Sequence, residues 1–213
     1  LASSAASDVY KRQMDTFVTE ADFWDDDSMQ REFLPGIIDE SKDKLVEFLG
    51  YIDTGIKDIS YEKIDDKIRI YTTHTGKNGK DYTLGLYNES DGTLKSILLY
   101  ILARVAILND KSLFIDELND RLHPLLLKYI IDLFYESDSM AQLIYTTHDT
   151  TLMDKKFFRR DQIWFVQKDE YGYSELVALS DYKVRSDASF EKDYLAGVYG
   201  GIPFLKEFQM KEK

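Results

Sequence analysis

The chain has 213 residues, with 27 Lys or Arg against 39 Asp or Glu, so its formal net charge at pH 7 is −12. This acidic balance argues against a protein that coats nucleic acid, because phosphate neutralisation requires a basic face. With no cysteine, the sequence excludes disulfides, thiolate metal sites, iron–sulfur clusters and a cysteine nucleophile. Its 44% apolar residues are enough for the core of one domain of ordinary size.

The beginning of the chain does not follow the pattern of a signal peptide. Residues 1–13 (LASSAASDVYKRQ) have no hydrophobic period, and their small residues precede Lys11 and Arg12 instead of following them. The segment resembles translated adapter sequence at the open end of an assembled metagenomic gene. We therefore expect residues 1–13 to be a non-native leader, with the true gene extending upstream.

The longest unbroken apolar run, from Ile97 to Ala103, is much shorter than the ~20 residues of a membrane-spanning helix. We expect no membrane segment. An acidic, cysteine-free chain without an export signal is expected to be cytoplasmic.

Residues 14–66 are predicted to form an acidic helical arm. After a break at Leu34-Pro35-Gly36, apolar residues recur at helical spacing from Ile37 to Ile52. The Asp25-Asp26-Asp27 cluster is predicted to be a solvated charge cluster. Three adjacent carboxylates on a helix diverge around its axis, which disfavours a shared metal ion.

From residue 67 to the end, we expect a second segment that opens with a β-hairpin. Apolar residues alternate over 68–72 and again over 82–86, and Gly76-Lys77-Asn78-Gly79-Lys80 lies between them as a turn. This turn is not a phosphate-binding P-loop, G-x-x-x-x-G-K-[ST], because its glycines are only 79 − 76 = 3 positions apart and Asp81 replaces the Ser or Thr. The sequence contains no other candidate for that motif.

Helices and strands then alternate. The pattern predicts helices at Thr93–Leu108 and His123–Tyr135 and buried strands at Ser112–Asp116 and Gln142–Thr146. Strands at 163–167 and 175–179 are expected to return antiparallel. Apolar strands separated by helices predict an α/β fold, with a mostly parallel sheet flanked by helices.

Two of the predicted strands end in polar side chains. Asp116 and Glu117 follow the first strand, at the sheet edge where α/β folds bind ligands, and carboxylates there can hold Mg²⁺ and polarise a water molecule. His148 follows the second strand, where an imidazole can hydrogen-bond a terminal phosphate. The alternatives are structural: capping or loop hydrogen bonds for the acids, and a backbone partner for the histidine.

A third cluster precedes the helix at 93–108. Ser90, Gly92 and Thr93 lie at its start, where free N–H groups and the helix dipole favour an anion. The alternative is an ordinary helix N-cap. The spacings of 116 − 90 = 26 and 148 − 116 = 32 residues each leave room for one helix and one strand.

Together these motifs resemble the C-terminal half of ABC-type ATPases, which have a P-loop NTPase-like fold. The resemblance is nearer still to the AAA/OLD-like ATP-binding proteins of the abortive-infection group, and it covers roughly residues 35–205. It rests on Glu89-Ser90-Asp91-Gly92-Thr93, Leu113–Glu117, Leu122-His123-Pro124, Thr146-Thr147-His148 and the ending Tyr194–Pro203.

The resemblance implies a role for each matching residue. Asp116 would position Mg²⁺, Glu117 would act as catalytic base, and His148 would contact the γ-phosphate of ATP. Ser90, Gly92 and Thr93 would close over ATP held by a second, facing subunit. Asn119 and Asp120 would communicate between the two sites, His123 would be structural, and Pro124 would suit the first turn of a helix.

The resemblance further implies ATP and Mg²⁺ as ligands and a homodimer or paired ATPase head as partner. It also suggests a nuclease or toxin effector in phage defence. Because the P-loop is missing, we expect weak ATP binding and no turnover by this chain alone, and an uncovered apolar sheet face. One alternative is a non-catalytic module that supplies its signature loop to a partner ATPase. A more distant one is a metal-dependent nuclease using Asp116, Glu117 and Asp25–Asp27, disfavoured by the acidic charge and by the lack of a lysine near the acid pair.

Overall fold

The computed structural model describes residues 27–51, 55–65, 67–119, 122–169, 171–185 and 188–201. The chain divides into two compact units, Leu1–His148 and Asp149–Lys213. In the described part, no helix is both long enough and apolar enough to cross a bilayer.

In the described part of the chain, the helix nearest the N-terminus is α3 (Asp27–Tyr51), which confirms the helical pattern predicted for this segment. It continues through Pro35, so the expected break at 34–36 is wrong. The irregular backbone lies instead at Ser41 (φ −125°, ψ 15°), where two helical stretches meet at a kink. Side chains of this helix form part of the core: Leu34, Ile37, Ile38, Leu45, Phe48 and Leu49 are buried.

A three-stranded antiparallel sheet follows, in the order β1 (Ile56–Ile64), β2 (Lys67–Thr75) and β3 (Asp81–Gly85). The predicted hairpin is confirmed, and its turn is closed by Gly79 N donating to Gly76 O at 2.9 Å. The helix expected to continue to residue 66 is wrong, because 56–64 is a strand. The expected boundary after residue 66 falls in the connection between β1 and β2, which pair with each other.

The remaining core elements of the first unit are α4 (Asp91–Leu108), β4 (Ser112–Ile115), α5 (Pro124–Tyr135) and β5 (Gln142–Tyr145). The predicted parallel pairing is confirmed: β4 and β5 are parallel, with Phe114 opposite Ile144. The short 3₁₀ turn η1 (Leu86–Asn88) connects β3 to α4.

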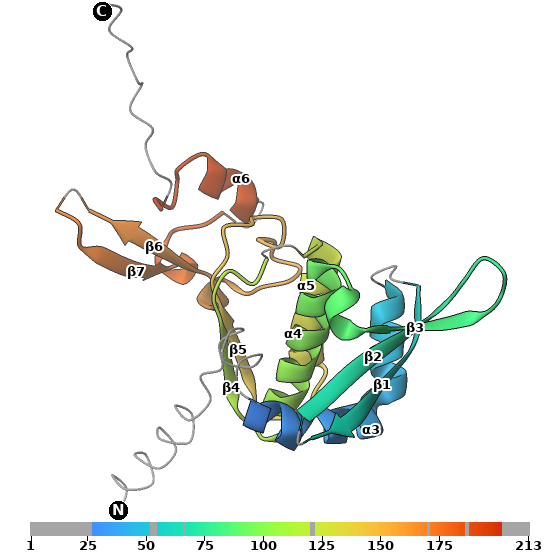
Figure 1. Cartoon of the computed structure of the whole chain (residues 1–213). Helices are drawn as coiled ribbons and strands as arrows, with labels where there is room; N and C mark the ends of the chain where they lie inside the picture. Colours follow the sequence, from blue (N-terminus) through green and yellow to red (C-terminus); the bar gives the residue numbers. More distant parts are fainter. Residues whose placement is uncertain are drawn as a thin grey trace, which may run out of the picture. The chain divides into compact units, whose positions relative to one another are not determined.

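These elements are layered around α4 (Figure 1). Helix α3 contacts β1, β2 and α4, and α4 and α5 pack against the β4–β5 pair. Thirteen residues of α4 are buried, from Thr93 to Ile107, as expected for a helix that is apolar on all sides. Phe48 stacks on Tyr100, with ring centroids 5.2 Å apart, and so joins α3 to α4.

The parallel sheet is smaller than expected. Among the described residues it consists of β4 and β5 alone, and every other strand pairing is antiparallel. One face of this pair presents Phe114 and Ile144, which are 38% and 45% exposed. Exposed apolar side chains are therefore present on the sheet, as the sequence predicts.

In the second unit, β6 (Trp164–Lys168) and β7 (Ser174–Ala178) confirm the predicted antiparallel return. The unit also contains the 3₁₀ turns η2 (Arg160–Gln162) and η3 (Leu179–Asp181) and the helix α6 (Phe190–Leu195). Its core is formed by Phe165, Leu179, Phe190 and Tyr199.

In the second unit, Gln167 holds the chain around Tyr199 in place. The Gln167 amide donates to Tyr182 Oη and to the Tyr199 carbonyl oxygen, both at 2.7 Å. Gly200 follows at φ +68°, directly against this amide. A glycine suits this position for two reasons: its backbone is left-handed, and a Cβ atom would lie 2.7 Å from Gln167 Nε2, so that the amide would have to shift.

Candidate functional site

The acid pair lies where the sequence predicts it, directly after β4 at the carboxyl end of the parallel pair. The Thr146 hydroxyl donates to Asp116 Oδ1 and accepts from Glu117 N, the latter at 2.9 Å. Backbone bonds extend the ladder beyond the strands: Thr146 N donates to Ile115 O and Leu118 N donates to Thr146 O. One threonine therefore fixes both acidic positions relative to β5.

Glu117 has a left-handed backbone, with φ +48°. This conformation costs about 1 kcal/mol for a residue with a Cβ atom. The side chain is exposed. An exposed carboxylate on a strained backbone, at the sheet edge where α/β folds commonly bind ligands, is typical of a functional position.

Asn119 brings His148 to the same edge. Thr147 Oγ1 donates to Asn119 Oδ1 at 2.7 Å, and Asn119 Nδ2 lies 3.2 Å from His148 Nε2. Because an amide nitrogen only donates, His148 Nε2 accepts and its ring proton is on Nδ1. The structure thus brings Asp116, Glu117 and His148 together along one edge, which we call the rim.

The predicted anion-binding turn forms the start of α4. Ser90 is the N-cap, and its Oγ accepts from Thr93 N at 3.2 Å and lies 2.9 Å from Thr93 Oγ1. Ser96 Oγ donates to the Gly92 carbonyl oxygen at 2.7 Å. The structure therefore shows the capping role, and Ser90 remains exposed.

Lys95 connects this helix start to the rim. The side chain is buried, and its Nζ donates to the Glu117 carbonyl oxygen at 3.4 Å. The expectation that no lysine lies near the acid pair is therefore wrong. Because Lys95 is 22 residues away from Glu117 in sequence, only the packing of α4 on the sheet reveals this proximity.

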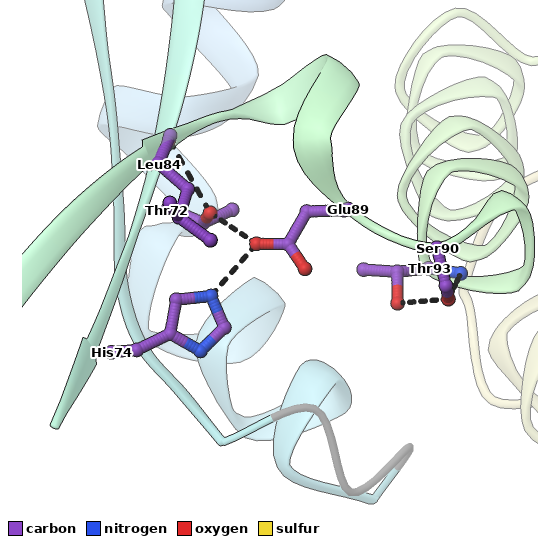
Figure 2. A network of polar contacts seen from close by, with 6 residues as sticks. All are labelled: Thr72, His74, Leu84, Glu89, Ser90 and Thr93. Carbon is purple, nitrogen blue, oxygen red and sulfur yellow. Dashed lines mark hydrogen bonds and ion pairs between the residues drawn. The ribbon is translucent and has the colours of Figure 1, made fainter. Parts of the chain in front are cut away.

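A second polar cluster lies beside Ser90 and was not predicted (Figure 2). Glu89 Oε1 accepts from the Thr72 hydroxyl and from His74 Nε2, the latter at 2.7 Å. The His74 and Glu89 side chains are each only 9% exposed. The Glu-Ser-x-Gly-Thr pattern contained Glu89, but no sequence signal connected it to a strand 15 residues earlier.

The rim offers few metal ligands. No group of three or more His, Asp or Glu side chains that suits a metal ion occurs among the described residues. Asp116 is exposed, and the Thr146 hydroxyl binds its Oδ1, so that among the described residues Oδ2 accepts no hydrogen bond. One carboxylate fits Mg²⁺, which keeps several waters and takes its other ligands from substrate phosphates.

Other predicted residues have structural roles or are not described. His123 caps α5, accepting from Leu125 N at 3.2 Å, and Pro124 begins that helix. Both agree with the sequence analysis. Asp120 and the side chains of Asp25–Asp27 lie outside the described residues.

The fold and the comparison with known families give the class of protein. A parallel strand pair with an acid pair at its carboxyl end, covered by helices, agrees with the α/β fold of P-loop ATPases. A family model described as "AAA domain, putative AbiEii toxin, Type IV TA system" matches residues 3–154. The match covers more than half of the chain, so the chain belongs to this family of AAA-type ATPase domains, in the abortive-infection group. No curated protein matches the chain.

Proposed function

We propose that the chain provides the hydrolysis edge and the signature turn of a dimeric, ABC-type ATPase. The observation that carries this proposal is the rim: Thr146 fixes Asp116 and Glu117, and Asn119 fixes His148 beside them. In this arrangement one sheet edge offers a metal-binding carboxylate, a base and a phosphate-binding imidazole.

Each side chain has a distinct task in this proposal. Asp116 would hold Mg²⁺ through Oδ2, the oxygen that the Thr146 hydroxyl does not bind. Glu117 accepts a proton from the attacking water, and the left-handed backbone presents its carboxylate to solvent. His148 meets the γ-phosphate of ATP, with its ring orientation set by Asn119. Mg²⁺, when bound, neutralises charge on the β- and γ-phosphates.

The signature turn serves a different nucleotide. Ser90, Gly92 and Thr93 lie at the start of α4, where backbone N–H groups and the helix dipole favour a phosphate held by a facing subunit. Of the three, Ser90 is exposed, whereas the Thr93 side chain is buried. We propose that two heads enclose ATP between them. Their closure and separation would regulate an effector, which we propose is a nuclease or toxin used in phage defence in the cytoplasm.

The sequence contains no P-loop motif, so this chain needs a P-loop from another segment to bind ATP tightly. The proposal is tested by joining the chain to the P-loop-bearing segment of another AAA domain of this family, which we call the completed head. Phosphate release by the completed head should fall at least ~100-fold in Glu117→Gln, as expected for loss of a general base. Equal turnover by wild type and Glu117→Gln would exclude the catalytic role.

A second candidate function is supported by the exposed Ser90 turn together with the missing P-loop motif. In it, the chain is a non-catalytic module that supplies its signature turn to a partner ATPase. The test adds the chain to an intact AAA head of the family whose own signature serine has been replaced, which we call the facing head. If the chain is such a non-catalytic module, Ser90→Ala in the chain would abolish its stimulation of the facing head, and Glu117→Gln in the chain would leave that stimulation unchanged.

A further inference from the structure

We propose that Glu89 is a positioning residue, through which Thr72 and His74 of β2 hold the signature turn in place. This inference rests on the proposed function of the Ser90 turn and adds a part that sequence motifs do not assign. Figure 2 shows Glu89 between the strand and the helix start, with its carboxylate directed to β2.

The first support is that the Glu89 carboxylate is bound inside the protein. It accepts from two side chains of one strand, the Thr72 hydroxyl and His74 Nε2. A carboxylate only accepts, so His74 Nε2 carries a hydrogen in this contact. Oε1 of Glu89 is therefore held by two side chains of β2.

The second support is that His74 and the chain around Glu89 are themselves fixed. The His74 ring stacks on Tyr82 of β3, with centroids 5.3 Å apart and planes at 13°. Glu89 N donates to the carbonyl oxygen of Leu86, which is buried, at 3.0 Å. Ser90, the next residue, caps α4. A displacement of the Glu89 side chain would therefore move the N-cap directly.

The third support is energetic. A nearly buried carboxylate is costly to desolvate, and an apolar residue of similar size would fill the same space at lower cost. Two hydrogen bonds with fixed directions locate Ser90 more narrowly than apolar packing does. Coupling between two sites is reciprocal in free energy. If the His74–Glu89 contact favours the ordered Ser90 turn, a ligand that orders the turn should therefore stabilise the His74–Glu89 contact by the same free energy.

The test measures the turn and its function separately. Amide hydrogen exchange at Thr93 and Leu94 reports on the N-cap, because these amides donate to Ser90 Oγ and Ser90 O. Stimulation of the facing head reports on function. We expect Glu89→Ala to speed exchange at both amides about 10-fold and to lower stimulation of the facing head by about the same factor. A factor of this size corresponds to the free energy of a lost hydrogen bond to a charged group.

Conservative variants distinguish positioning from general damage. Glu89→Gln keeps an acceptor oxygen and His74→Gln keeps an N–H donor, so both should retain slow exchange and most of the stimulation. Glu62→Ala, an exposed glutamate of β1, is the matched control and should change neither. If Glu89→Ala does not fold, Thr72→Val removes one donor at nearly constant volume and should speed exchange by about 3-fold.

The outcomes separate the two proposals. Unchanged exchange at Thr93 and Leu94 in Glu89→Ala, or in Thr72→Val if that variant replaces it, would overturn the positioning role. Faster exchange that Glu89→Gln restores, together with no stimulation even by the wild-type chain, would uphold the positioning role and overturn the proposed function of the turn.

Discussion

Asn119 and His148 are in hydrogen-bond contact at 3.2 Å, although they are 29 positions apart in the sequence. The contact joins the loop after β4 to the loop after β5, and the Thr147 hydroxyl reinforces it at the other end of the same amide. Asn119 therefore orients His148 beside the acid pair.

Replacing Asn119 should disorder the rim without unfolding the sheet. Asn119→Ala removes both hydrogen bonds of the amide, whereas Thr147→Val removes only the bond from Thr147 to Asn119 Oδ1, so a comparison of the two variants isolates the contact with His148. For Asn119→Ala relative to Thr147→Val, we expect about a 10-fold loss of phosphate release by the completed head, the size of one positioning hydrogen bond, and a shifted His148 ring resonance. An unmoved resonance would show that the contact does not form in solution.

The left-handed backbone of Glu117 should lower the stability of the protein. Glycine adopts φ +48° without steric cost, so Glu117→Gly should be about 1 kcal/mol more stable than Glu117→Ala in chemical denaturation. The matched control is Glu136, with φ −86°, where glycine should be the less stable of the two. The same order at both positions would contradict the strain at Glu117.

Tyr100 makes the stability of the first unit sensitive to alkaline pH. Burial raises its pKa to about 12, so the folded state retains the phenol proton after the unfolded state loses it near the ordinary value of 10. The resulting stabilisation is complete below pH 10 and is lost as the pH rises towards 12.

Tyr100→Phe should flatten this pH dependence, measured as the free energy of unfolding between pH 8 and 12. Some slope should remain, because burial also raises the pKa of Tyr129, and the pKa of Tyr199 is raised to about 12. Stability at neutral pH should not fall, since Tyr100 Oη has no hydrogen-bond partner in the described structure. An identical slope in both proteins would contradict the assignment to Tyr100.

In the second unit, Gly200 and Gly197 form a matched pair. Both have positive φ, +68° and +77°, so alanine at either should cost about 1 kcal/mol. At Gly200 the new Cβ would also lie 2.7 Å from Gln167 Nε2, whereas nothing lies within 4 Å at Gly197. Gly200→Ala should therefore cost a further ~1–3 kcal/mol in denaturation followed by Trp164 fluorescence. Equal losses would show that the Gln167 amide moves freely.

The sequence predicted the elements whose apolar pattern matches their secondary structure. Helix α4 and the β4–β5 pair are examples, since their apolar runs are bounded by polar residues. β1 was missed because its register shifts between Ile56 and Asp58. That shift lets Ile56 and Ile59 both be buried, three residues apart, which imitates a helical period.

The site could be predicted only in part. Strand ends are visible in a sequence, and so Asp116, Glu117 and His148 were found. Lys95 and His74 reach their partners through the packing of α4 on the sheet and through the hairpin pairing. Neither produces a local pattern. The role of the Thr146 hydroxyl, which binds both acidic residues, could likewise not be predicted, because it depends on the β4–β5 register.

The central claim, that the carboxyl edge of β4–β5 binds the metal–nucleotide complex, is tested by paramagnetic broadening of the chain's amide resonances. Manganese with ATP broadens nearby amides even when binding is weak. We predict selective broadening at residues 117–119 and 146–148, abolished by Asp116→Asn and unaffected by Asp138→Asn, an exposed acid elsewhere. Broadening concentrated elsewhere, or equally strong in Asp116→Asn, would contradict the assignment.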